Sequence, residues 1–196
     1  MLDRAHAGGC DLLDTAQAYG DAERMIGEQD IAAKPFRLVT KTLPAKGRPL
    51  TDLTVAGICA AFDESLLRLK RDCVYGLLVH HVDDLLGENG GHLWQALEQL
   101  KRSRRVTRLG VSVYHPEQLR LVLDRFPIEL VQLPFNLYDQ RFARSGLLAL
   151  LKRKGVEVHA RSAFLQGLLL MPAEKLTGYF VPFRSLQERV HLRIQE

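Results

Sequence analysis

Six short apolar runs, separated by segments with helical spacing, limit what this chain can fold into more than any other feature of its sequence. The runs are rich in β-forming residues, and several are continuous, which is typical of strands that are covered on both faces. Strand and helix thus alternate through six rounds, which predicts right-handed crossovers and a parallel sheet. The predicted strands lie at residues 11–14, 36–41, 73–80, 108–113, 129–133 and 156–161.

Two of the helical segments allow predictions about individual side chains. Residues 51–69 have apolar positions at helical spacing, and Thr51 or Asp52 is placed to cap the start of this helix. Residues 21–27 predict a shorter helix, with Asp21 placed to cap it, that turns Met25 and Ile26 toward the core.

The same alternation is compatible with two kinds of parallel α/β fold. No GxGxxG motif follows any predicted strand, so a dinucleotide-binding Rossmann fold loses its main support. A closed (β/α)8 TIM barrel fits the pattern better, but it needs eight strands and typically about 250 residues. The chain has 196 residues and no linker that would divide it. We therefore expect residues 1–196 to form one domain, an incomplete barrel of about six βα units.

Composition narrows the function classes and the cellular compartment. The net charge of +4 is spread along the chain. The basic run at residues 101–105 is predicted to be a solvated or phosphate-contacting surface, so no nucleic-acid partner is expected. No apolar run approaches the roughly 20 residues of a membrane span. Three cysteines without a CxxC pair favour a reducing compartment, and residues 1–10 do not resemble a signal peptide. These features predict a cytoplasmic protein without a membrane partner.

Four polar residues stand at or just after the ends of three successive predicted strands: Asp14, Tyr19, Lys41 and His80. Strand ends in a parallel barrel face one mouth, so these side chains can converge. A free tyrosine has a pKa near 10, and a neighbouring ammonium lowers the pKa of a phenol by favouring its ionised form. A carboxylate would hold the ammonium in place, and a histidine would donate a hydrogen bond to a substrate oxygen. The set suits protonation of a carbonyl oxygen while hydride reaches its carbon.

Each residue alone has a plainer interpretation, as a packed aromatic, a solvated lysine, a turn acid or a core histidine. A metal site is a further alternative, because His80 and His81 precede Asp83 and Asp84. Adjacent residues of a strand point to opposite faces, however, and the HxH spacing of barrel hydrolases is absent. No metal is therefore expected.

The order and spacing of these motifs resemble the aldo-keto reductase family. The resemblance extends through most of the chain and fades after about residue 170. It is carried by Asp14-Thr15-Ala16-Gln17-Ala18-Tyr19-Gly20, Val39-Thr40-Lys41, Leu77-Leu78-Val79-His80, Arg108-Leu109-Gly110-Val111-Ser112, Val131-Gln132 and Asn136.

The resemblance implies a (β/α)8 barrel that reversibly reduces a small aldehyde or ketone, usually with NADPH, with NADH as an alternative. It implies that Tyr19 is the general acid, that Lys41 lowers its pKa, that Asp14 anchors Lys41 and that His80 orients the carbonyl. The implied cofactor contacts are Ser112 and Gln132 at the nicotinamide amide, Arg161 at the place of a stacking aromatic, and Ser162 and Gln166 at the pyrophosphate.

By comparison with the family, the first and last strands of the barrel are missing. The two missing strands would leave open sheet edges, so self-association through these edges is expected to be possible. Two alternatives to the reductase remain at this point. One is a truncated, catalytically inactive remnant or binding module, and the other is a metal-dependent barrel hydrolase.

Overall fold

The computed structural model describes residues 2–29 and 36–195, and its contacts divide the chain into two compact units. The first unit extends to Leu133 and also includes Arg141–His159. The second unit consists of Pro134–Gln140 and the residues from Ala160 onward.

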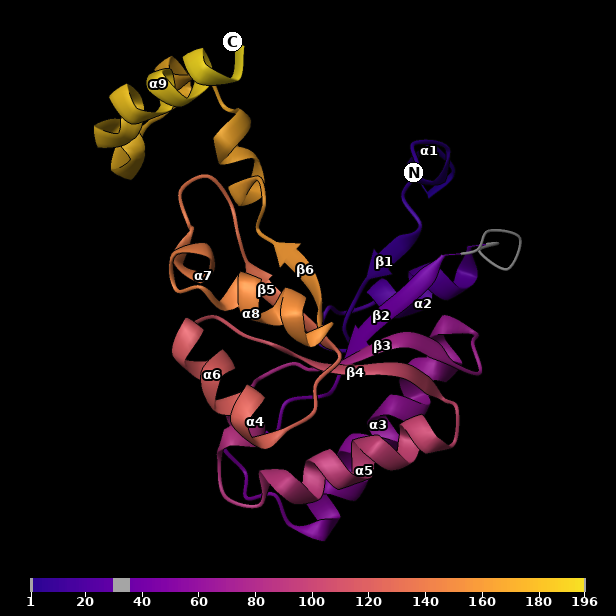
Figure 1. The fold of residues 1–196 in the computed structure, drawn as a ribbon. Helices are drawn as coiled ribbons and strands as arrows, with labels where there is room; N and C mark the ends of the chain where they lie inside the picture. Colours follow the sequence, from indigo (N-terminus) through magenta and orange to yellow (C-terminus); the bar gives the residue numbers. More distant parts are fainter. Residues whose placement is uncertain (1, 30–35, 196) are drawn as a thin grey trace. The chain divides into compact units, whose positions relative to one another are not determined.

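The strands form one sheet whose order follows the chain from β1 to β6 (Figure 1). Each pairing from β1 to β5 is parallel, and Leu13 pairs with Leu38, Val39 with Gly76, and Ser112 with Gln132. The predicted alternation of strand and helix is therefore confirmed. The strands are β1 Leu12–Asp14, β2 Arg37–Lys41, β3 Val74–Val79, β4 Val106–Ser112, β5 Leu130–Pro134 and β6 Glu157–Arg161.

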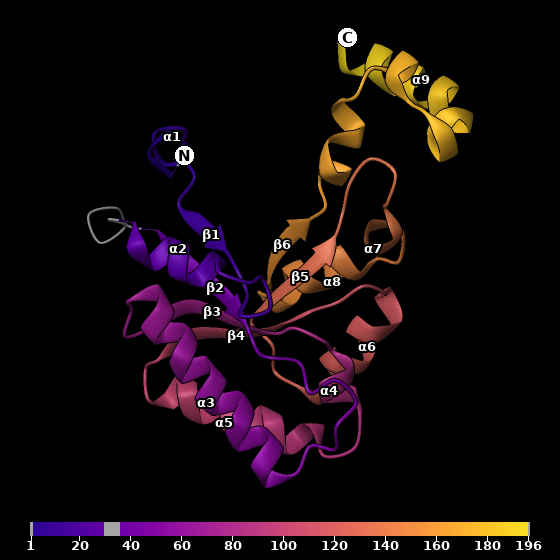
Figure 2. The same cartoon turned by 180° about the vertical axis from the view of Figure 1, so that it is seen from behind.

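Helices occupy the connections between these strands in the first unit. The long helices α3 and α5 lie side by side, α5 contacts β4, and α2 packs against α3 (Figure 2). No helix in the described part of the chain is long and apolar enough to cross a bilayer. The helices are α1 Leu2–Ala7, α2 Ala22–Glu28, α3 Asp52–Leu69, α4 Asp83–Leu86, α5 Gly90–Arg102, α6 Pro116–Arg125, α7 Arg141–Arg144 and α8 Leu147–Lys154.

The start of α3 agrees with the sequence. The Thr51 hydroxyl accepts a hydrogen bond from the Thr54 backbone N–H at 3.2 Å, which satisfies one of the amides that a helix leaves free at its first turn. Thr51 is therefore the residue that caps the helix. The helix ends at Leu69 and is followed by Lys70, whose left-handed backbone has φ 53°.

The prediction that Met25 of α2 faces the core was wrong. Met25 is exposed and Ile26 is half-buried, whereas Glu23 and Gly27 are the buried residues of this helix. Gly27 lies so close to α3 that an added Cβ would stand 2.0 Å from the Arg68 carbonyl oxygen. Glu23 accepts hydrogen bonds from the Thr40 hydroxyl at 2.7 Å and from the Arg68 Nε at 2.9 Å. Close packing and a buried ion pair, rather than apolar surface, therefore set which face of α2 is inward.

Two glycines make room for a leucine between the strands of the first unit. A Cβ on Gly110 would lie 1.8 Å from the Leu130 carbonyl oxygen, and a Cβ on Gly76 would lie 2.7 Å from the Leu130 side chain. Leu130 packs with Val39 and Leu78 in a fully buried cluster. Burying each such side chain contributes about 1.5–3 kcal/mol.

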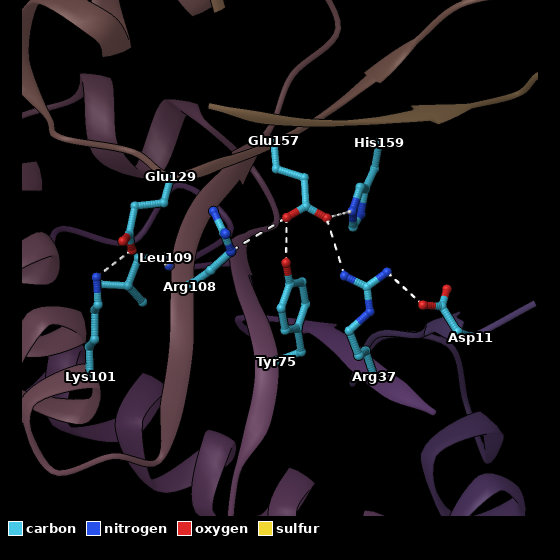
Figure 3. Close-up of polar contacts among 9 residues, drawn as sticks. All are labelled: Asp11, Arg37, Tyr75, Lys101, Arg108, Leu109, Glu129, Glu157 and His159. Atoms are coloured by element: carbon cyan, nitrogen blue, oxygen red, sulfur yellow. Dashed lines mark hydrogen bonds and ion pairs between the residues drawn. The ribbon is translucent and has the colours of Figure 1, made fainter. Parts of the chain in front are cut away.

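A polar network surrounds Glu157 at the start of β6 (Figure 3). The Tyr75 hydroxyl donates a hydrogen bond to Glu157, and His159 Nε2 lies 2.8 Å from the Glu157 Oε1. Arg108 Nε and Arg37 Nη1 lie 3.4 and 3.9 Å from the same carboxylate. The Arg37 guanidinium also stacks over the Tyr75 ring at 4.7 Å from its centroid. Glu157 thus connects β6 to β2, β3 and β4.

We expect Glu157 to make the stability of the first unit depend on pH. Burial alone would raise the pKa of Glu157, but the Tyr75 and His159 hydrogen bonds and the Arg108 charge outweigh it, and the pKa is lowered from its usual 4.5. A lowered carboxyl pKa stabilises the fold above the unfolded value, and this contribution is lost as the pH falls through the folded value. Urea unfolding followed by circular dichroism should therefore show less loss of stability in Glu157→Gln than in the wild type between about pH 6 and 3.

Glu88→Gln provides the control for this experiment, because Glu88 is an exposed glutamate in the loop after α4. It should retain the wild-type pH dependence. If Glu157→Gln also follows the wild-type curve, the carboxylate does not contribute in the way expected.

One buried glutamine connects several segments of the second unit by hydrogen bonds. Gln187, in helix α9, donates hydrogen bonds to the carbonyl oxygens of Leu168 and Met171 at 3.0 and 2.9 Å. It also accepts a hydrogen bond from the Tyr138 hydroxyl. This bond ties residues 134–140 to the end of the chain. The helical elements of this unit are η1 Leu165–Leu170, η2 Ala173–Lys175, η3 Gly178–Phe183 and α9 Arg184–Gln195.

Candidate active site

Three neighbouring strands place the four candidate catalytic residues at one end of the sheet. Asp14 is the last residue of β1, and Tyr19 lies in the loop that leads from β1 to α2. Lys41 is the last residue of β2, and His80 directly follows β3. The carboxyl ends of parallel barrel strands are where barrel enzymes carry their active sites.

Lys41 and Asp14 form a close ion pair. The Lys41 ammonium donates to Asp14 Oδ1 at 2.8 Å, to Asp14 Oδ2 at 2.9 Å and to the Thr15 carbonyl oxygen at 2.9 Å. Lys41 is only 2% exposed, whereas the Asp14 side chain is 35% exposed. A buried ammonium needs such partners, because an unpaired charge is costly to remove from water. The contacts hold the positive charge of Lys41 at a fixed place.

Tyr19 lies next to this charge and next to His80. The Lys41 Nζ stands 4.9 Å from the centroid of the Tyr19 ring, within the range of a cation–π contact. The His80 and Tyr19 rings meet edge to face with centroids 5.8 Å apart. The His80 backbone N–H donates to the Thr42 hydroxyl at 3.3 Å, which ties the histidine to the loop after β2. A phenol, an ammonium and an imidazole thus share one region of the first unit.

Ser112 and Gln132 are brought together by the pairing of β4 with β5. They are register partners, with Ser112 as the last residue of β4 and Gln132 in the middle of β5, and both are buried. The Val113 N–H donates to the Gln132 carbonyl oxygen at 2.9 Å and continues this pairing. The Gln132 Nε2 donates to Asp14 Oδ1 at 2.9 Å, so Gln132 contacts the lysine–aspartate pair directly.

The other three candidate cofactor residues belong to the second unit. Arg161 is the last residue of β6, and Ser162 and Gln166 have left-handed backbones with φ 57° and 55°. Asn136 is buried and donates its amide to the Ser162 carbonyl oxygen at 3.2 Å. Such conformations are uncommon for residues other than glycine and occur often at ligand sites.

Two threonines of this region were not identified as site residues from the sequence. The Thr15 carbonyl oxygen accepts from Lys41, and the Thr42 hydroxyl accepts from the His80 backbone. Both follow a strand end directly, and that position was the only available signal. The described residues contain no group of three or more His, Cys, Asp or Glu side chains arranged to hold a metal ion.

The fold and the site define an α/β barrel protein with an ionisable cluster at its strand ends. A sequence model described as the aldo/keto reductase family matches residues 1–180. The chain therefore belongs to the aldo/keto reductase family.

Known relatives agree with this assignment and cover the chain well. Aldo-keto reductase str7 from Strobilurus tenacellus is 31% identical over 178 residues, which are 86% of this chain and 51% of that protein. The holo form of aldo-keto reductase AKR11C1 from Bacillus halodurans superposes with a TM-score of 0.73 at 25% identity, over 91% of this chain and 61% of that chain. Glycerol dehydrogenase AKR11B4 from Gluconobacter oxydans gives 0.70 at 25% identity, over 91% and 56%.

The chain spans about half the length of the curated relatives that it matches. The sheet of six parallel strands with alternating helices corresponds to part of the (β/α)8 barrel of these reductases. The expectation of an incomplete barrel is thereby confirmed.

Proposed function

We propose that this chain reduces an aldehyde or ketone to an alcohol with NADPH, with NADH as the alternative cofactor. Family membership supports oxidoreductase activity. One observation carries the assignment of the site: a buried Lys41 ammonium, fixed by Asp14, lies 4.9 Å from the centroid of the Tyr19 ring.

In this proposal Tyr19 gives its hydroxyl proton to the carbonyl oxygen and regains a proton from solvent. The Lys41 charge stabilises the phenolate that is left behind, and Asp14 keeps this charge in place. His80 donates a hydrogen bond to the carbonyl oxygen and orients it. The half-exposed position of Tyr19 leaves its hydroxyl accessible to a substrate.

The chemistry of two buried side chains fits a nicotinamide. A reduced nicotinamide, when bound, supplies the hydride that reaches the carbonyl carbon. The Ser112 hydroxyl and the Gln132 amide can donate to and accept from a carboxamide, and the strand pairing places them side by side. We further propose that Arg161 stacks on the nicotinamide ring and that Ser162 and Gln166 contact the pyrophosphate. A guanidinium is planar and stacks on aromatic faces.

The proposal extends to partners and compartment. The proposed substrate is a small carbonyl compound. Residues 1–196 are proposed to act as one functional domain in the cytoplasm, and to self-associate through open barrel edges. All three cysteines are free thiols, which supports a reducing compartment. Three cations of the basic run pair with acids, which argues against a nucleic-acid partner. The pairs are Lys101 with Glu129, Arg102 with Glu98, and Arg105 with Asp63.

Fluorescence titration with NADPH, followed by an assay of its oxidation, tests the proposed function. We expect a saturable change in cofactor fluorescence and consumption of NADPH when an aldehyde is added. Parallel titration with NADH measures the preference between the two cofactors. The name of one structural relative suggests glycerol oxidation with NADP⁺ as an assay of the reverse reaction.

The absence of both cofactor binding and turnover, with any aldehyde and at millimolar cofactor, would overturn the proposal in favour of an inactive remnant or binding module. Activity that is lost on addition of a chelator would instead favour the metal-dependent hydrolase.

A further inference from the structure

The Asp14 carboxylate receives hydrogen bonds from two side chains of different strands. Its Oδ1 atom accepts from Lys41 Nζ at 2.8 Å and from Gln132 Nε2 at 2.9 Å, and its Oδ2 atom accepts from Lys41 at 2.9 Å. Lys41 and Gln132 are buried, while the Asp14 side chain is partly open to solvent. Gln132 therefore contacts the most exposed member of this group from the protein interior.

The chemistry of the pair fixes which way the Gln132 amide points. Asp14 is bonded to an ammonium and is therefore a carboxylate, which can only accept hydrogen bonds. The amide nitrogen must face it, because the amide oxygen in the same place would put two acceptors in contact. This orientation leaves the Gln132 oxygen directed away from Asp14.

We infer that Gln132 is a positioning residue for the Asp14–Lys41 pair, and the inference rests on the proposed function. Asp14 lies at the end of a strand of only three residues, and without the Gln132 amide its carboxylate would turn more readily toward water. The Lys41 ammonium would then lose the fixed place that holds it 4.9 Å from the Tyr19 ring centroid. Gln132 thus acts on Tyr19 through two intervening groups, in addition to its proposed contact with the cofactor.

Two variants of Gln132 test this inference. Gln132→Met keeps the volume and removes the donor, and Gln132→Glu sets a second carboxylate against Asp14. Leu133→Met is the matched control, because it places methionine at the next buried position of the same strand, and volume-conserving swaps are well tolerated. Urea unfolding of each variant establishes that the fold is retained.

The first measurement uses the free protein and needs no activity. In ¹⁵N-lysine-labelled protein the Lys41 ammonium, with its three bonded acceptors, should give a slowly exchanging signal, which Lys41→Arg assigns by its loss. We expect this signal to shift or broaden in Gln132→Met and to remain unchanged in Leu133→Met. An unchanged signal in Gln132→Met overturns the inference, whether or not the chain proves to be a reductase.

The second measurement separates positioning from cofactor binding. We expect kcat to fall about 10- to 100-fold in Gln132→Met at saturating cofactor, as for loss of a hydrogen bond to a charged group. Gln132→Glu should lose more activity at pH 8 than at pH 6, because burial and the adjacent Asp14 carboxylate raise the pKa of a glutamic acid at this position, and its protonated form can still donate to Asp14. If only the cofactor Kd changes while kcat and the pH profile stay as in the wild type, Gln132 is a cofactor ligand alone.

Discussion

Replacing Tyr19 by phenylalanine is expected to lower the turnover of carbonyl reduction by about 10²- to 10⁴-fold, the usual contribution of a general acid. The variant keeps the ring that meets Lys41 and His80, so the cation–π and edge-to-face contacts should persist. Only the donated proton is lost. Cofactor affinity, measured by fluorescence titration, should therefore remain close to the wild-type value while kcat falls.

Tyr114→Phe is the matched control, because Tyr114 is 52% exposed and Tyr19 is 49% exposed. It should retain wild-type turnover. Full activity in Tyr19→Phe would remove Tyr19 from the acid role, even if the chain binds NADPH. A loss of turnover that is equal in both variants would point to a general effect of removing a hydroxyl and would also contradict the assignment.

Replacing Arg68 by methionine is expected to lower the free energy of unfolding by about 3–5 kcal/mol, as for a buried charge that loses its partner. Glu23 is 0% exposed. Its Oε2 atom accepts a hydrogen bond from Arg68 Nε at 2.9 Å and lies 2.9 Å from Arg68 Nη2. The Thr40 hydroxyl satisfies only the other oxygen. Urea unfolding at pH 7 measures the loss.

Arg102→Met is the control for this change, because Arg102 is 73% exposed and pairs with Glu98 on the surface at 3.2 Å. Such pairs contribute about 0–1 kcal/mol. Adding Glu23→Leu to Arg68→Met should recover much of the lost stability, since the uncompensated charge is then gone. A loss in Arg68→Met no greater than that in Arg102→Met would mean that Glu23 is not held by this arginine.

The strands and their polar ends could be predicted because each depends on local sequence. The apolar runs around Val39 and Leu78 end in Lys41 and His80, and parallel pairing brings strand ends to one side. The helix start at Thr51 was predictable for the same reason, since its capping bond reaches only three residues along the chain.

The remaining features depend on partners far away in the sequence. Gln132 meets Asp14 across 118 residues, and Glu23 meets Arg68 across 45. Nothing near Glu23 indicates that a carboxylate will be buried in preference to Met25. The left-handed backbone at Ser162 was likewise not predictable, because the residue at this position is not a glycine. Side-chain contacts between distant segments thus explain most of what the sequence did not predict.

Gly110 in β4 has a consequence for the placement of Gln132. Any side chain at position 110 would collide with the backbone oxygen of Leu130, so β5 would have to move to accept it. Gln132 lies two residues further along that strand and would be carried away from Asp14. Position 110 can therefore hold only glycine unless β5 shifts, so a residue without a side chain controls the contact between Gln132 and Asp14.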